Sequence, residues 1–76
     1  MSRSRGVHRY QILVAWSPED SVFVAQVPDL PGCIAHGRSE QKAFENAKSA
    51  IELYLEGLSE SGDAIPEPRQ YHLLSA

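Results

Sequence analysis

The sequence predicts an α+β fold, in which a three-stranded antiparallel sheet carries one long amphipathic helix on one face. Two short runs rich in β-branched and aromatic residues, 10–16 and 22–27, stand five residues apart. Further along, apolar residues recur at the helical period between positions 43 and 58. Strands followed by one long helix in a chain of 76 residues give the order βββα.

The first two strands are expected to form a hairpin. Residues 17–21 (SPEDS) have the chemistry of a turn, because Pro18 fixes its own φ and the Asp20 side chain can bond back to the main chain. The short connection then favours antiparallel pairing of 10–16 with 22–27.

An irregular bend is expected after the hairpin. Pro28 and Pro31 cannot donate to a ladder, and Gly32 can adopt a positive φ where the chain turns. Asp29 is predicted to accept main-chain N–H bonds and so to fix the route into a short third strand, 33–36. The predicted structural motif consists of Pro28, Asp29, Pro31, Gly32, Cys33 and Gly37.

The helix is predicted to span residues 40–60, with Ser39 as its N-cap and Gly62 as its stop. Its apolar stripe comprises Ala43, Phe44, Ala47, Ala50, Ile51, Tyr54, Leu55 and Leu58. Residues 71–74 are apolar enough to form a short fourth strand, βββα(β), or a docking tail. We treat 1–76 as one domain, with a disordered tail at 1–8, a core at 9–68 and a tail or strand at 69–76.

The two long strands are apolar on both faces. Alternation places Tyr10, Ile12, Val14 and Trp16 on one face of the first strand, and Leu13 and Ala15 on the other. One helix covers one face, so we expect another chain to bury the rest. The chain has one cysteine and therefore no internal disulfide, which also favours a homo-oligomer, a dimer or a tetramer. Exposed aromatic residues such as Trp16 would then be partner-binding anchors.

The composition argues against several classes of protein. A net charge of −3 disfavours nucleic-acid binding, although Arg3, Arg5 and Arg9 form either a solvated tail or a basic arm. No run is long and apolar enough for a membrane span, and the N-terminus does not resemble a secretory signal. A cytoplasmic protein is expected.

No catalytic, cofactor or metal site is predicted. A two-metal nuclease centre needs converging carboxylates, and none of the three predicted strands contains one. Cys33 and His36 lie three positions apart, so in a strand they point to opposite faces. Cys33 is therefore interpreted as a buried, inert thiol.

Several motifs resemble the N-terminal domain of HicB-like antitoxins. They are the run Val27-Pro28-Asp29-Leu30-Pro31-Gly32-Cys33, the small residues up to Gly37, the helix start Ser39-Glu40-Gln41-Lys42-Ala43, Asn46-Ala47, and Ile65-Pro66-Glu67-Pro68. The resemblance covers residues 10–68. It implies a partial ribonuclease-H-like fold without nuclease activity, which masks a small basic RNA-cleaving toxin.

The resemblance also raises alternatives. Full-length antitoxins of this family usually carry a DNA-binding domain, and the few residues after Pro68 do not suffice for one, so no direct DNA binding is expected. The chain is then either an antitoxin or a solitary oligomeric interaction domain without a toxin; a metal-dependent nuclease is the least favoured alternative. The predicted partner-binding residues are Trp16, Glu45, Glu52 and Glu56.

Overall fold

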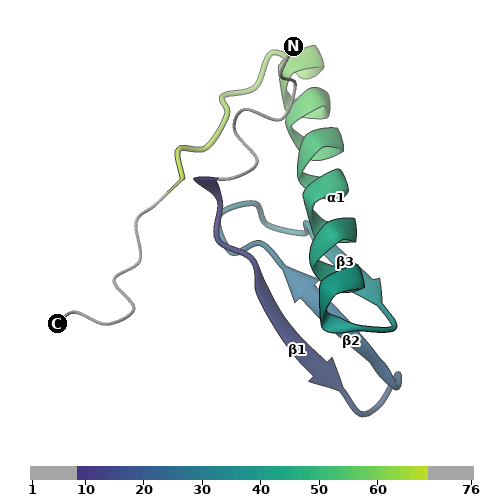
Figure 1. Cartoon of the computed structure of the whole chain (residues 1–76). Helices are drawn as coiled ribbons and strands as arrows, with labels where there is room; N and C mark the ends of the chain where they lie inside the picture. The colour runs from purple at the N-terminus through teal and green to yellow at the C-terminus, as the bar shows by residue number, and fades with distance from the viewer. Residues whose placement is uncertain (1–8, 69–76) are drawn as a thin grey trace, which may run out of the picture.

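The computed structural model describes residues 9–68, so the predictions for 1–8 and for a strand at 71–74 lie outside the described residues. It contains the strands β1 (Leu13–Ser17), β2 (Val22–Gln26) and β3 (Ile34–Gly37), followed by the helix α1 (Glu40–Ser61). The strands form one antiparallel sheet in the order β1-β2-β3. Figure 1 shows α1 running across one face of this sheet, which confirms the predicted α+β arrangement.

The strand boundaries differ slightly from the predicted ones. The first strand begins at Leu13, which pairs with Gln26, and not at Tyr10. Every second residue of β2 directs its N–H and C=O towards β1, and the next such residue after Gln26 is Pro28, which has no N–H. The β1–β2 ladder therefore ends at Gln26. The third strand starts at Ile34 because the N–H of Cys33 is bonded within the preceding bend.

The helix has the predicted caps. The Ser39 hydroxyl oxygen accepts a hydrogen bond of 3.0 Å from the Lys42 main-chain N–H. At the other end Gly62 adopts a left-handed φ of 78°, and its N–H bonds to main-chain carbonyls of the last turn. These two caps set the limits of the helix at Glu40 and Ser61.

The core between α1 and the sheet is built from small residues at one end and larger ones at the other. Four alanines, Ala25, Ala35, Ala43 and Ala47, form a cluster where the start of α1 lies on β2 and β3. The second cluster consists of Tyr10, Val27, Leu30, Cys33 and Ile51. Its two largest fully buried side chains are Leu30 and Ile51. Helix and sheet therefore approach most closely near the start of α1.

That close approach explains one error in the predicted core. Phe44 was assigned to the buried stripe, but 41% of its surface is exposed. The neighbouring Ala43 is fully buried and belongs to the alanine cluster between α1 and the sheet, whereas Phe44 lies one position further round the helix. The ring instead lies at the side of α1, with the Lys48 ammonium 5.2 Å from its centroid.

A candidate protein-binding surface

The bend between β2 and β3 is closed by its own main chain. Val27 donates to the Cys33 carbonyl (3.1 Å), Leu30 to the Val27 carbonyl (3.0 Å) and Cys33 to the Leu30 carbonyl (2.9 Å). Gly32 adopts a φ of 86°, a conformation that L side chains rarely adopt. The predicted motif thus forms a tight reversal that feeds β3 back along β2.

The same bend is anchored to the helix. The Tyr54 hydroxyl donates a hydrogen bond of 2.9 Å to the Pro31 carbonyl. Asp29 is buried, while Pro28 and Pro31 are exposed. A carboxylate buried in this way needs compensating hydrogen bonds, which fits the predicted scaffold role of Asp29. That Asp29 accepts main-chain N–H bonds stays a prediction.

Cys33 and His36 point in opposite directions. Cys33 is 4% exposed, and its burial raises the pKa of the thiol. His36 is exposed on the far side of β3. The thiol is therefore protonated near neutral pH and shielded from solvent, as expected of a packing residue.

Trp16 lies on the β1–β2 hairpin, which extends past the start of α1 (Figure 1). Its ring meets that of Phe23 edge to face, with centroids 5.0 Å apart and an interplanar angle of 68°. Half of Trp16 remains exposed. A half-exposed ring that is held in place by a neighbour suits an interface anchor.

The sheet face that points away from α1 is largely apolar. The register places Leu13 beside Gln26, with Ile34 next to them on β3. It puts Val24 between Ala15 and His36 in the next row. Leu13 is 53% exposed and Ile34 51% exposed. The described residues thus leave this face without the cover that α1 gives to the other, as the sequence predicted.

The outward face of α1 is acidic. Glu45, Glu52 and Glu56 are all exposed, and the Gln41 amide donates a hydrogen bond of 3.2 Å to Glu45. Lys48 lies among these acids in sequence, but its ammonium is held over the Phe44 ring at the side of the helix. The Lys48 ammonium therefore lies beside the row of glutamates and not within it.

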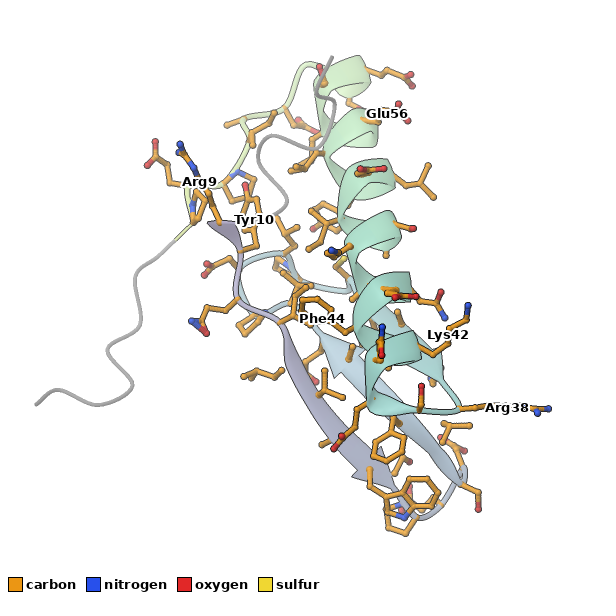
Figure 2. The ribbon with its side chains drawn as sticks, viewed as in Figure 1. Arg9, Tyr10, Arg38, Lys42, Phe44 and Glu56 are labelled. Atoms are coloured by element: carbon orange, nitrogen blue, oxygen red, sulfur yellow. The ribbon has the colours of Figure 1, made fainter. Side chains whose placement is uncertain are left out.

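The predicted partner-binding residues do not gather at one point. Trp16 pairs with Phe23, which pairs with Gly37 just before α1, so Trp16 lies level with the start of the helix. Glu56 is sixteen residues into α1, about 24 Å further along its axis. Figure 2 shows Glu56 near the far end of the helix. A partner that contacts both must span the length of the domain.

One exposed residue was missed by the sequence analysis. Leu53 is 69% exposed, although it is a large apolar side chain on α1. It lines a shallow hollow of about 310 Å³ beside the free edge of β3. The hollow is lined by Gly32, Cys33, Ile34, Ala50, Leu53 and Tyr54. The sequence did contain a signal for this surface, because Leu53 is a large apolar residue outside the predicted apolar stripe of the helix.

Neither a metal centre nor a membrane span is found in the described part of the chain. Within residues 9–68, no group of three His, Cys, Asp or Glu side chains could hold a metal ion. None of the helices in that range is long and apolar enough to cross a membrane.

Comparisons with known proteins give a family. The model of the HicB-like antitoxin of bacterial toxin–antitoxin systems matches residues 10–76. A UPF0150 protein of Thermoplasma acidophilum is 36% identical over 58 residues, which cover 76% of this chain and 83% of that protein. A UPF0150 protein of Thermotoga maritima is 36% identical over 56 residues, or 74% of this chain and 71% of that protein. An uncharacterised 14.9 kDa protein of Haemophilus phage HP1 is 40% identical over 45 residues, 59% of this chain but 34% of the phage protein.

Proposed function

The chain belongs to the HicB-like antitoxin family, and from this membership we propose that it is a non-enzymatic module that binds and masks a small basic RNA-cleaving toxin. Residues 1–76 would act as one domain in the cytoplasm, where such a toxin meets its RNA. The order β1-β2-β3 followed by a helix across one face supports a partial ribonuclease-H-like fold. We propose neither a cofactor nor direct DNA contact.

The observation that carries this proposal is the acidic row of α1. Glu45, Glu52 and Glu56 are exposed and, by helical spacing, lie on the side of α1 opposite the buried Ala43, Ala47 and Ile51. A basic toxin would be attracted to this row from a distance, which accelerates association more than it deepens affinity. Trp16 would add an apolar anchor at one end of the same domain.

A second function is favoured by a different observation. The outer sheet face carries Leu13, Val24 and Ile34 beside the polar Gln26 and His36, and it is largely apolar and uncovered by α1. Large uncovered apolar surface on a small domain favours self-association. A solitary oligomeric interaction domain, a dimer or a tetramer with no toxin partner, is therefore the alternative to an antitoxin.

A pull-down from the native lysate tests the antitoxin function first. We expect the tagged chain to retain a small basic protein in a stoichiometric amount. That protein should cleave RNA when alone and stop cleaving it when this chain is added back. Recovery of the tagged chain alone, at the mass of an oligomer, would instead support the solitary module. Mg²⁺-dependent RNA cleavage by this chain itself would contradict both.

Charge reversal then tests the surface. Replacement of Glu45, Glu52 and Glu56 by Lys should slow toxin association about tenfold or more at low salt, with a smaller effect at high salt. The matched control reverses Glu19, Asp20 and Asp63, exposed acids outside the row, and gives the same change in net charge. Equal slowing by both triple variants would show that net charge, and not this face of α1, drives association.

A further inference from the structure

β3 has a free edge, and the hydrogen bonds of the bend show which groups point out of it. The Cys33 carbonyl accepts from Val27, so the polar groups of Cys33 face β2. Because these directions alternate along a strand, the N–H and C=O of Ile34 and His36 point to the free edge. The Asn46 amide donates a hydrogen bond of 2.7 Å to the His36 carbonyl. This bond agrees with the alternating directions of the N–H and C=O groups along β3. It covers the His36 end of the free edge, and Ile34 lies at the other end.

One stripe of α1 lies above this edge. It follows the spacing i, i+4, i+7, i+11, i+14, i+18 and consists of Lys42, Asn46, Ser49, Leu53, Glu56 and Glu60. Asn46 fixes the stripe on the β3 side through its bond to His36. Leu53 also lies on the β3 side, because it lines the same hollow as Ile34. Figure 2 shows Lys42 projecting on the side of α1 away from β1.

The charges on this stripe are polarised. Lys42 stands at the N-terminal end, Glu56 and Glu60 at the C-terminal end, and Leu53 near the middle. Such a stripe is complementary to itself in antiparallel orientation, because the Lys42 of each copy then faces the Glu60 of the other. The midpoint between positions 42 and 60 is position 51, beside Ala50 and Leu53, which line the hollow together with Ile34. The centre of the stripe and the open end of the β3 edge thus lie at the same level.

We propose that a second copy of this chain docks here about a two-fold axis, with β3 against β3 and α1 antiparallel to α1. The two sheets would join into one with six strands, and both helices would lie on the same face. Paired strands lie about 4.8 Å apart and packed helices about 8–10 Å apart. The two spacings are compatible because α1 contacts β2 as well as β3, so that its axis is set back from the free edge of β3.

The charge pattern favours a second copy over a basic toxin at this edge. Lys42 would repel a basic partner, and Asn46, Ser49 and Leu53 carry no charge. The two acids of the stripe, Glu56 and Glu60, lie only at its C-terminal end, so a basic partner meets no continuous acidic surface here. In a chain of net charge −3, self-association is easiest where the acids of one copy meet a base of the other. This interface rests on the self-association proposed above but places it at the free edge of β3 instead of on the outer sheet face, and it is independent of whether a toxin binds.

Sedimentation and light scattering of the purified full chain over a range of concentrations measure the dimer Kd. We expect Leu53→Glu to raise this Kd about 30-fold or more, because it places like charges near the axis. The matched control is Leu13→Glu, at an exposed leucine of the outer sheet face. A larger effect at Leu13 than at Leu53 would overturn the proposed interface and transfer it to the sheet face.

A charge swap tests the antiparallel register. Lys42→Glu and Glu60→Lys should each raise the dimer Kd about fivefold, and the double variant should restore it. Within one copy these residues are about 27 Å apart along α1, too far to interact, so restoration must arise between copies. Both changes are favourable for the helix dipole, because they place an acid near the N-terminus of α1 and a base near its C-terminus. Thermal unfolding checks that each variant folds.

The outcomes separate this inference from the proposed function. A wild-type dimer that the Leu53 variant dissociates and the double charge swap restores supports the interface. A wild-type oligomer unaffected by these variants overturns the interface but leaves self-association standing. A wild-type monomer at all concentrations overturns both, while inhibition of the toxin, assayed separately, still decides the antitoxin function.

Discussion

The Tyr10 hydroxyl donates a hydrogen bond to the main-chain carbonyl of Pro66, and this bond joins the start of the described chain to its end. Tyr10 is buried in the core cluster that contains Ile51. The stretch 63–68 has no regular secondary structure, and Figure 2 shows it returning from the end of α1 towards Tyr10. Tyr10 therefore both fills the core and holds the segment that follows the helix.

Replacing Tyr10 by Phe should lower the free energy of unfolding by about 1 kcal/mol, because it keeps the ring and removes the bond to Pro66. Urea unfolding of the wild type and the variant measures the difference. Tyr54→Phe, which removes the bond to the Pro31 carbonyl, is a comparison at a less buried tyrosine. An unchanged midpoint for Tyr10→Phe would mean that the bond adds nothing to stability.

The same tyrosine should make stability sensitive to alkaline pH. Burial, followed by the negative charges of Asp29 and Glu67, raises the pKa of Tyr10 above its ordinary value of 10.0. The folded state thus favours the protonated phenol, and this contribution is complete below about pH 10 and lost as pH rises further. Wild type and Tyr10→Phe should therefore converge in stability above pH 10. A constant difference between them up to pH 11, measured by urea unfolding, would contradict a raised pKa.

Gly37 marks the closest approach of β3 to α1. A Cβ at this position would lie 2.3 Å from the Ala43 main-chain nitrogen, so Gly37→Ala must push the start of the helix away. We expect a loss of about 1–3 kcal/mol in the free energy of unfolding. Gly57→Ala is the matched control, because a Cβ there meets nothing within 4 Å and Ala favours the helix by about 1 kcal/mol. We expect Gly37→Ala to lower the melting temperature and Gly57→Ala to raise it. An unchanged melting temperature in Gly37→Ala would disprove the close approach.

Much of this fold can be predicted from the local chemistry of the sequence. Ser39 and Gly62 identified the two ends of α1 because capping depends on side-chain chemistry within a few residues. The alternation of faces in the hairpin followed from the geometry of a strand. The packing distance between helix and sheet was not accessible in this way, since it depends on four alanines that are distant in sequence. For that reason Phe44 was wrongly placed in the core, and the exposed Leu53 was overlooked.

The corrected helix phase makes a sharper prediction for two core substitutions. Ile51 is fully buried, so Ile51→Ala should cost about 2–5 kcal/mol and leave so small a domain largely unfolded. Phe44→Ala should cost less, about 1 kcal/mol, because 41% of the ring is already exposed and its removal leaves no enclosed cavity. Circular dichroism during thermal unfolding distinguishes the two. Equal losses would mean that Phe44 belongs to the core after all.

Cys33 should resist alkylation in the folded protein. Burial raises the pKa of its thiol, so the reactive thiolate is scarce. Although Cys33 lines the hollow beside β3, only 4% of its surface is exposed, which restricts access of the reagent. We expect iodoacetamide at pH 8 to modify Cys33 about 100-fold more slowly than the single cysteine of a Cys33→Ala, Ser61→Cys double variant, since Ser61 is exposed. Mass spectrometry follows both reactions, and the two rates should become equal in urea. Similar rates in the folded state would show that the core around Cys33 opens readily, so that the bend between β2 and β3 would not be the rigid scaffold described above.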